Sequence, residues 1–410
     1  MFRGIQGKII FLAVIIGLLP GIVGVTLTYL GGTHLLKNSI GSNFHEIARK
    51  ESEYMRRVIE KEIDEVHSLA ISPFIRKYVE DENLKYNSKG NEEIIGEINS
   101  IENIWPRLKE NSPILRNIMN NEVAEYIKEY KKREGEEYAE IFITDAKGAV
   151  IAATNKTSDY FQADEKWWEE AYNNGKGSVY LSDVEYDESA KVFALNFCIP
   201  IMDKSNKRVI GIIKVIADIK HLFSGIINVH IGETGHSDLV SSDGTVIIDA
   251  ISPPLSWKIN EGLISKISAS RGGWPLDKDE HGINSIIGFS HVEWGSKFSA
   301  SSLGNKNWYI FVRQDMPEAY TPIFGLLWKV SIVGVLLIGI FTLVALSIAR
   351  QIVRPLLILQ DGVGLIGQGK LNQRLEIKTK DEIGDLANSI NRMAVELENG
   401  TNELEFQRGE

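Results

Sequence analysis

The sequence predicts an α+β protein with two membrane-spanning helices, and three observations lead to this prediction. Apolar residues recur at helical spacing in long stretches near both ends of the chain. The middle of the chain is rich in β-branched and aromatic residues, separated by the Asp/Gly turn signals typical of antiparallel sheets. Two uncharged apolar runs are each long enough to cross a bilayer as a helix.

The composition indicates a folded, acidic protein with more than one domain. A chain of 410 residues is longer than one ordinary domain. The formal net charge of −10, with no basic stripe, argues against nucleic-acid binding. The single cysteine, Cys198, excludes a disulfide framework and a cysteine-based zinc site. No metal-ligand spacing and no arrangement of a nucleophile or acid–base pair occurs, so we expect no metal, no cofactor and no enzyme activity.

The two apolar runs predict a membrane topology. Residues 9–30 and 330–349 contain no charged side chain, and the second run extends upstream to residue 323 with only Lys329 interrupting it. The first run is long for a signal peptide and no small-residue cleavage site follows it, so we expect an uncleaved anchor. Basic residues lie on the terminal side of each run: Arg3 and Lys8 precede the first run, and Arg350 and Arg354 follow the second.

By the positive-inside rule, these basic residues place both termini in the cytoplasm. The predicted segments are a cytoplasmic N-terminus (1–8), a first span (9–30), an extracytoplasmic region (31–322) and a second span (323–349).

The extracytoplasmic region is predicted to begin with a long helix at residues 34–80. Its apolar residues fall at spacings of three and four, and no glycine or proline interrupts residues 42–72. Shorter helices follow, broken near Pro106 and Pro113, and the last of them ends at Gly135.

Two similar strand–turn–strand patterns follow the helices. The turn at 145–148 (Asp-Ala-Lys-Gly) is echoed at 242–244 (Ser-Asp-Gly), each between β-rich segments. Further strands are predicted at 208–218, 283–293, 297–303 and 307–315. This weak repeat predicts two α/β modules, at 138–220 and 227–318.

An acidic and aromatic stretch lies inside the first module. Residues 159–188 contain nine acidic and two basic side chains among tyrosines and tryptophans. Two interpretations remain open. The stretch is either a cage for a small polar or cationic molecule, or a solvated acidic surface over core tryptophans.

A long helix that emerges from the membrane and precedes two such modules resembles the double Cache sensor domain of bacterial receptors. The resemblance covers residues 34–318 and is carried by FITDAKGAVIAAT, DEKWWEEAYNNGKG, DVEYD and GIIKVIADIKHLF. It implies two PAS-like antiparallel sheets. It also implies that the ligand binds in the membrane-distal module, at residues 138–218.

Amino-acid-sensing members of that family use a tyrosine, an arginine two residues before a tryptophan–aromatic pair, and a late aspartate. Trp167, Trp168 and Asp218 match this pattern, but Glu165 occupies the arginine position. A carboxylate there cannot hold a ligand carboxylate, so an amine, another cation or a polar solute is favoured. The predicted ligand-binding residues are Tyr160, Asp164, Trp167, Trp168, Tyr180, Asp183, Asp187 and Asp218.

Residues 348–401 resemble a HAMP domain, and a short tail (402–410) follows. Two heptad seams, at 352–366 and 383–397, flank a connector of about 15 residues. The resemblance implies a parallel, dimeric four-helix bundle. The predicted signal-relay residues are Arg354, Pro355, Gly369, Leu371, Asp381, Glu382 and Gly384.

Together these features predict a homodimeric inner-membrane receptor that senses a small extracytoplasmic solute and relays it through HAMP. Three alternatives remain. In the first, the chain is the sensory part of a histidine kinase, diguanylate cyclase or methyl-accepting chemotaxis protein whose output domain is missing, because 402–410 is too short for an output domain. Alternatively, its HAMP domain contacts a separate cytoplasmic output protein, or the first module binds peptides or a partner domain.

Overall fold

The computed structural model describes residues 5–109, 111–135, 137–278, 282–294 and 306–408. Two compact units can be distinguished, Lys37–Ala319 and the pair of segments Met1–Leu36 and Tyr320–Glu410. The first unit is mixed α and β, whereas the described part of the second is helical. The predicted α+β class is therefore confirmed.

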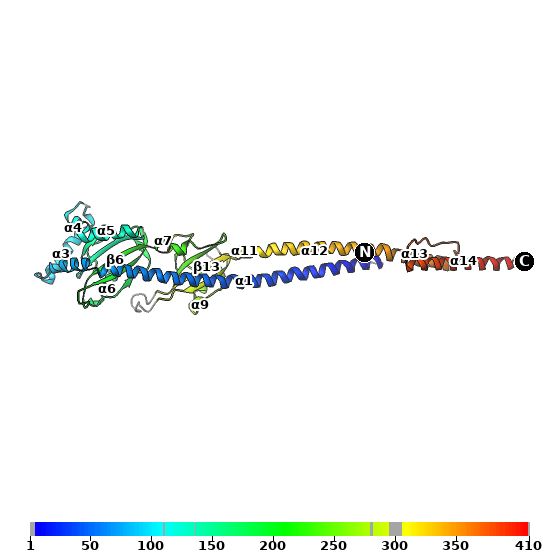
Figure 1. Ribbon diagram of the computed structural model, residues 1–410, viewed down its shortest axis with the longest axis horizontal. Helices are drawn as coiled ribbons and strands as arrows, with labels where there is room; N and C mark the ends of the chain where they lie inside the picture. The colour runs from blue at the N-terminus through cyan, green and yellow to red at the C-terminus, as the bar shows by residue number, and fades with distance from the viewer. Residues whose placement is uncertain (1–4, 110, 136, 279–281, 295–305, 409–410) are drawn as a thin grey trace. The chain divides into compact units, whose positions relative to one another are not determined.

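Helix α1 (Ile5–Ala70) continues from the first apolar run into the sensory unit without a break. In that unit it lies beside both sheets (Figure 1) and buries Phe44, Met55, Ile59 and Val66 on one side. The long helix was predicted to reach residue 80, but the structure has two helices there. Ser72 has a ψ of 124°, because the residue before a proline avoids helical geometry, and α2 (Pro73–Leu84) starts anew.

The first module is an antiparallel sheet in the order β2-β1-β6-β5-β3, with β4 paired to β5. Helix α6 contacts β5 and β6 of this sheet. Its strands are β1 (Tyr138–Asp145), β2 (Val150–Ala153), β3 (Tyr180–Leu181), β4 (Glu185–Asp187), β5 (Val192–Met202) and β6 (Val209–Asp218). Its helices are α3 (Asn91–Ile104), η1 (Trp105–Arg107), α4 (Pro113–Met119), α5 (Glu122–Glu134), α6 (Lys166–Tyr172), η2 (Asn173–Gly175), α7 (Ile219–Leu222) and α8 (Ser224–Ile227).

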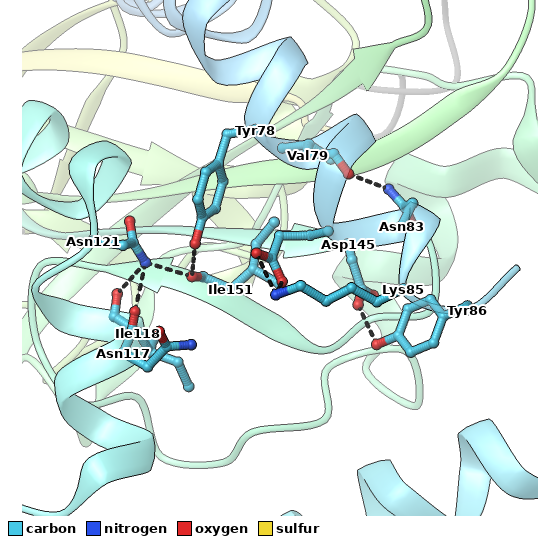
Figure 2. Close-up of polar contacts among 11 residues, drawn as sticks. Tyr78, Val79, Asn83, Lys85, Tyr86, Asn117, Ile118, Asn121, Asp145 and Ile151 are labelled. Carbon is cyan, nitrogen blue, oxygen red and sulfur yellow. Dashed lines mark hydrogen bonds and ion pairs between the residues drawn. The ribbon is translucent and has the colours of Figure 1, made fainter. Parts of the chain in front are cut away.

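Polar side chains tie the helices to the β1–β2 hairpin (Figure 2). Asn83 of α2 donates to the Ile210 carbonyl at 2.7 Å and accepts from the Ala146 amide at 3.1 Å. Tyr86 donates to Asp145 Oδ2 at 2.7 Å, and Asn121 donates to the Ile151 carbonyl at 2.9 Å. These contacts satisfy backbone groups at the hairpin and fix where the helices lie against it.

The second module repeats the arrangement of the first. Its order is β10-β12-β13-β8-β7, with β9 paired to β8 and β11 paired to β12. The hairpin turns of the two modules both contain a glycine with positive φ, 89° at Gly148 and 84° at Gly244, which explains why both sequences carry glycine there. The elements are β7 (His230–Ile231), β8 (Gly235–Ser241), β9 (Val246–Ile248), α9 (Glu261–Ser268), β10 (Gly272–Gly273), β11 (Leu276–Lys278), β12 (Asn284–His291), β13 (Trp308–Asp315) and α11 (Met316–Ala319).

The strand predicted at 297–303 lies outside the described residues. The predicted repeat is otherwise visible in the pairing of the strands, since β1–β2 and β8–β9 are both antiparallel hairpins. In both modules the long central strand, β6 or β13, lies between the first strand of the hairpin and one further long strand.

The second unit contains helices that are long and apolar enough to cross a membrane. Helix α12 (Thr321–Ile348) continues through η3 (Ala349–Val353) into α13 (Arg354–Gly367), and the apolar part of α1 also belongs to this unit. A Cβ placed on Gly17 of α1 would lie 3.2 Å from Ile338, so α1 and α12 pack closely at this glycine. Most apolar side chains of both spans are exposed, as expected for segments whose solvent is lipid.

The C-terminal helices α13 and α14 (Glu382–Arg408) pack through a small apolar cluster around Leu359, Leu375 and Ala387. Asp381 accepts from the amides of Ile383 and Gly384, both at 3.2 Å, and thus caps α14. The other predicted relay residues lie at the ends of these elements. Arg354 and Pro355 open α13, Gly369 has a φ of 87° in the connector, Leu371 is half-buried, and Glu382 is the first residue of α14.

Two features of the HAMP region explain why a glycine stands at position 384 and identify a further structural residue, Asn391. A Cβ on Gly384 would lie 2.1 Å from the Thr379 carbonyl, so the position requires glycine. Asn391 accepts from the Leu375 amide at 2.8 Å and donates to the Leu375 carbonyl at 3.0 Å. This bidentate contact holds the connector on α14 and was not predicted.

Candidate functional site

The sheet of the first module has one face covered by helix α6, and we call it the covered face. Strand alternation places Glu140, Phe142 and Thr144 of β1 on it, together with Lys214 of β6. Trp167 of α6 packs edge-on against Phe142, with ring centroids 5.8 Å apart. The side chains on this face belong to a cluster that is mostly apolar, so polar groups there are unusual.

Lys214 is a buried cation on the covered face. Its residue is 9% exposed, and its ammonium nitrogen lies 4.6 Å from the Trp167 ring centroid and 5.6 Å from that of Phe142. Among the residues that the structure describes, no carboxylate lies within ion-pair distance of it. Cation–π contacts compensate only part of the cost of burying a charge, so Lys214 retains capacity to bind an anionic group.

Glu140 is a fully buried acid on the same face. Burial, with a smaller contribution from Asp187, raises the pKa of Glu140 to about 7, although the hydrogen bond with Ser189 and the charges of Lys214 and Lys131 lower it. Its Oε1 atom has no hydrogen-bond partner within the described part of the chain. A buried acceptor without a partner is rare in folded proteins, so Oε1 retains the capacity to accept a hydrogen bond.

Asn196 supplies a second acceptor of this kind. Its Oδ1 atom is buried and likewise has no partner among the described residues. Glu140 and Asn196 lie opposite the same residue, Ile216, from the strands on either side of β6. The sheet therefore presents two buried acceptors and one buried cation on one face.

The predicted aromatic residues divide into two groups. Trp167 faces Lys214, whereas Trp168 donates to Thr144 Oγ1 at 3.0 Å and stacks on Tyr172. Tyr160 is buried against Trp105, with ring centroids 5.3 Å apart. Trp168 and Tyr160 are therefore part of the hydrophobic core of the first module. Tyr180 of β3 is half-buried, and burial raises its pKa to about 12.

The predicted acidic residues lie mostly at the surface. Asp164 is exposed, as is Glu165, which occupies the position of the family's arginine. Asp183 is also exposed and pairs with Lys306 of the second module. Asp218 caps α7 by accepting from the Lys220 amide at 2.9 Å.

Asp187 is the one predicted acid that the structure brings to the buried polar groups. Its Oδ1 accepts from the Ser189 hydroxyl, and that hydroxyl also lies 2.9 Å from Glu140 Oε2. Much of the acidic stretch is thus a solvated surface, and Asp187 connects it to the buried polar groups through Ser189.

The sequence prediction missed Glu140, Asn196 and Lys214. A signal for two of them was present, because each is a charged residue inside an otherwise apolar strand, in YAEIFI and GIIKVIA. Strand periodicity alone does not reveal which face such a residue occupies.

The sheet face of the second module that packs against α9 contrasts with this arrangement. Arg313 of β13 lies opposite His236 of β8, and its Nε atom is 3.0 Å from Asp238 Oδ2. The guanidinium also lies over the Trp257 ring at 5.0 Å. The buried cation of this module is thus neutralised by a carboxylate of its own sheet, whereas no carboxylate in the described ranges pairs with Lys214.

Metal and thiol chemistry find no support at either sheet. Within the described ranges, no three His, Cys, Asp or Glu side chains are grouped as a metal ion would require. Cys198 of β5 is fully buried, and burial raises the pKa of its thiol to about 12, so the thiol is unreactive near neutral pH.

Two similar sheet modules on a long helix, two apolar helices and a helix–connector–helix segment define a transmembrane sensor receptor. The chain belongs to the double Cache family. Residues 32–323 match its Cache domain (dCache_1), and residues 347–399 match the HAMP domain.

Relatives of known class are chemotaxis receptors. The chain is 24% identical over 259 residues to the methyl-accepting chemotaxis protein McpA of Bacillus subtilis (strain 168), which covers 63% of this chain and 36% of that protein. It is 25% identical over 177 residues to the methyl-accepting chemotaxis protein PctB of Pseudomonas aeruginosa, covering 42% of this chain and 26% of PctB. The chain thus spans about a third or less of the length of these relatives.

Solved structures with a similar arrangement are sensory domains. The extracellular domain of the putative histidine kinase rpHK1S-Z16 aligns over 69% of this chain and 98% of its own, with a TM-score of 0.46 and 12% identity. The ligand-binding domain of Pseudomonas aeruginosa PctB in complex with L-Gln aligns over 68% and 92%, with a TM-score of 0.41 and 15% identity.

Proposed function

We propose that this receptor senses a small dipolar solute on the covered face of its first module. The observation that carries the proposal is a buried lysine with no ion-pair partner beside two buried acceptors with no hydrogen-bond partner, all among the residues that the structure describes. Lys214 offers a positive charge, while Glu140 Oε1 and Asn196 Oδ1 offer acceptors. Trp167 and Phe142 supply apolar contact area beside Lys214.

The polarity of these groups narrows the solute class. An amine or another cation would be held by Glu140 and Asn196 alone, but it would gain nothing from Lys214. A solute that carries an anionic group as well as donors can use all three side chains. We therefore favour a zwitterion over the simple amine that the acidic stretch of the sequence suggests.

Strand β1 offers a route from this site to the long helix. It carries Glu140 on the covered face, while Tyr138 of the same strand donates to Glu62 Oε2 of α1 at 2.5 Å. Both partners of that bond are buried. We propose that solute binding shifts β1, that α1 and α12 transmit the shift, and that the HAMP helices alternate between two packings.

The flanking basic residues support an inner-membrane location with both termini in the cytoplasm. Under this topology the HAMP helices face a cytoplasmic output. That output is either a segment encoded after Glu410 or a separate protein, and the length of the chemotaxis relatives favours the former. Sequencing of the downstream reading frame distinguishes these two arrangements.

A thermal-shift screen of the full chain in nanodiscs tests the proposed solute class. The panel contains glycine, γ-aminobutyrate, putrescine, acetate, glucose and calcium. A zwitterion should raise the melting temperature through mass action, and a solute at 100 times its Kd adds about 2.7 kcal/mol. A shift by acetate or putrescine alone would contradict the dipolar class, and no shift by any small solute would favour a peptide or protein ligand.

The C-terminal helices support a homodimer. Of the seam residues, Leu356, Val363, Leu386 and Met393 are 44–50% exposed in the single chain. A second copy packed in parallel would cover this face. Val363→Cys should therefore form an intermolecular disulfide under mild oxidation in membranes, whereas Asp361→Cys, off the seam, should do so much more slowly. Equal cross-linking of the two variants would argue against this packing.

A further inference from the structure

We propose that the site of the first module also binds a proton, and that Glu140 is the group that holds it. The inference rests on the proposed function in one respect, because it assigns the proton to the same polar groups that receive the solute. It predicts that the charge of the site changes by one unit near neutral pH.

The contacts of Ser189 provide the first argument. Its hydroxyl oxygen lies 2.7 Å from Asp187 Oδ1 and 2.9 Å from Glu140 Oε2. A hydroxyl has one proton and can donate it to only one of these two carboxyl groups. The other contact needs a proton from the carboxyl side, or it places two lone pairs against each other.

The surroundings of Asp187 indicate which carboxyl group supplies that proton. Asp187 Oδ1 also accepts from the amides of Ser189 at 3.0 Å and Ala190 at 2.9 Å, inside the β4–β5 turn. An oxygen that accepts from two amides does not carry a proton of its own, so the 2.7 Å contact with Ser189 is made by the hydroxyl proton. Glu140 Oε2 then faces the lone pair of Ser189 Oγ and donates a proton to it.

The charges around Glu140 agree with a protonated carboxyl group. Asp187 of β4 disfavours its ionised form, while Lys214 of β6 and Lys131 of α5 favour it. Lys131 donates to the Ala139 carbonyl, and no cation among the described residues lies within 4 Å of Glu140. Burial outweighs both these cations and the lowering effect of the Ser189 contact, so the pKa of Glu140 rises from 4.5 to about 7.

The proton changes what the site accepts. With Glu140 neutral, Lys214 dominates and the site suits an anionic group. With Glu140 ionised, a carboxylate and an ammonium group lie on one face, which suits a zwitterion. An arriving ammonium group can therefore replace the proton without changing the net charge of the buried site, which avoids the cost of burying an additional charge.

Infrared difference spectroscopy of the full receptor without added solute tests the proposal, with the proton itself as the probe. The carboxylic acid C=O band of wild type minus Glu140→Gln should be present one pH unit below 7 and should vanish one unit above. The glutamine side chain is isosteric and retains a donor for Ser189, so this variant should fold. Absence of the band at both pH values would overturn the proposal.

Two further measurements extend this test. Lys214→Met removes a charge that favours ionised Glu140, so the band should persist to higher pH, and an unchanged midpoint would contradict a shared site. The folded-state pKa lies above 4.5, so the stability due to the proton is present below pH 4.5 and is lost as the pH rises through about 7. The melting temperature of wild type should therefore fall relative to Glu140→Gln over this range.

These outcomes are separate from those of the solute screen. If the infrared band of protonated Glu140 is seen but no solute raises the melting temperature, Glu140 is a proton site and the proposed ligand class is wrong. If a solute raises the melting temperature but the band is absent, the receptor function stands and the proton proposal is wrong.

Discussion

Replacing Lys214 with methionine is expected to reduce solute-induced stabilisation strongly while leaving the solute-free receptor folded. A hydrogen bond to a charged group contributes about 1.5–3 kcal/mol, so its loss weakens binding by roughly 10- to 150-fold. Methionine retains the apolar stem against Trp167. Replacement of a buried charge by an apolar side chain of similar volume is often neutral or stabilising for the fold. Calorimetric titration with the zwitterion found in the screen measures the loss.

Lys220→Met provides the matched control. Lys220 lies in α7, just after the strand that carries Lys214, but its side chain is exposed. The same substitution there should leave the affinity within a factor of two. If both variants bind the solute as tightly as wild type, Lys214 does not contact it and the proposed site is wrong. If the Lys214 variant loses its cooperative melt even without solute, the lysine supports the fold instead.

Replacing Asp145 with alanine should cause a large loss of stability in the first module. The carboxylate is 1% exposed and accepts from three donors: the Lys147 amide at 2.8 Å, the Ala149 amide at 3.0 Å and the Tyr86 hydroxyl at 2.7 Å. Alanine leaves these donors buried without an acceptor, each at a cost of about 1–3 kcal/mol. Burial raises the pKa of Asp145, which means that burying its charged form is itself unfavourable. Removing the carboxylate therefore offsets part of the cost, and we expect a net loss of stability of about 3 kcal/mol.

The internal repeat supplies a control for this variant. Asp243 belongs to the equivalent turn of the second module, where it pairs with Lys258, but its side chain is 59% exposed. Solvent screens this pair, so Asp243→Ala should cost less than about 1 kcal/mol. Urea unfolding of both variants in detergent, followed by tryptophan fluorescence, gives the comparison. Equal losses would show that the buried network around Asp145 contributes little.

Local pattern predicted much of the fold. The helical period of α1, the two glycine turns and the uncharged runs each depend on neighbouring residues, so one sequence is sufficient to reveal them. The break at Ser72 was missed for a physical reason. Ile75 and Val79 of α2 are fully buried and continue the apolar spacing of α1, so the periodicity persists across a kink that only Pro73 indicates.

The candidate site was predicted less well, because it is made by strand pairing. The acidic and aromatic stretch is conspicuous in the sequence, but its carboxylates are mostly solvated. Glu140 and Asn196 meet only because β1 and β5 both pair with β6. No spacing along the chain encodes that pairing. The same limit applies to the HAMP connector, where Asn391 holds Leu375 and neither belongs to the predicted motif.

The buried thiol of Cys198 makes this receptor convenient for spectroscopy. It is the only cysteine of the chain, and it is inaccessible and unreactive in the folded state. A cysteine introduced at any exposed position can therefore be labelled selectively without first deleting a native residue. Pairs of spin labels on α1 and α12 would then report helix displacements in the intact wild-type background, with the sensory core unaltered.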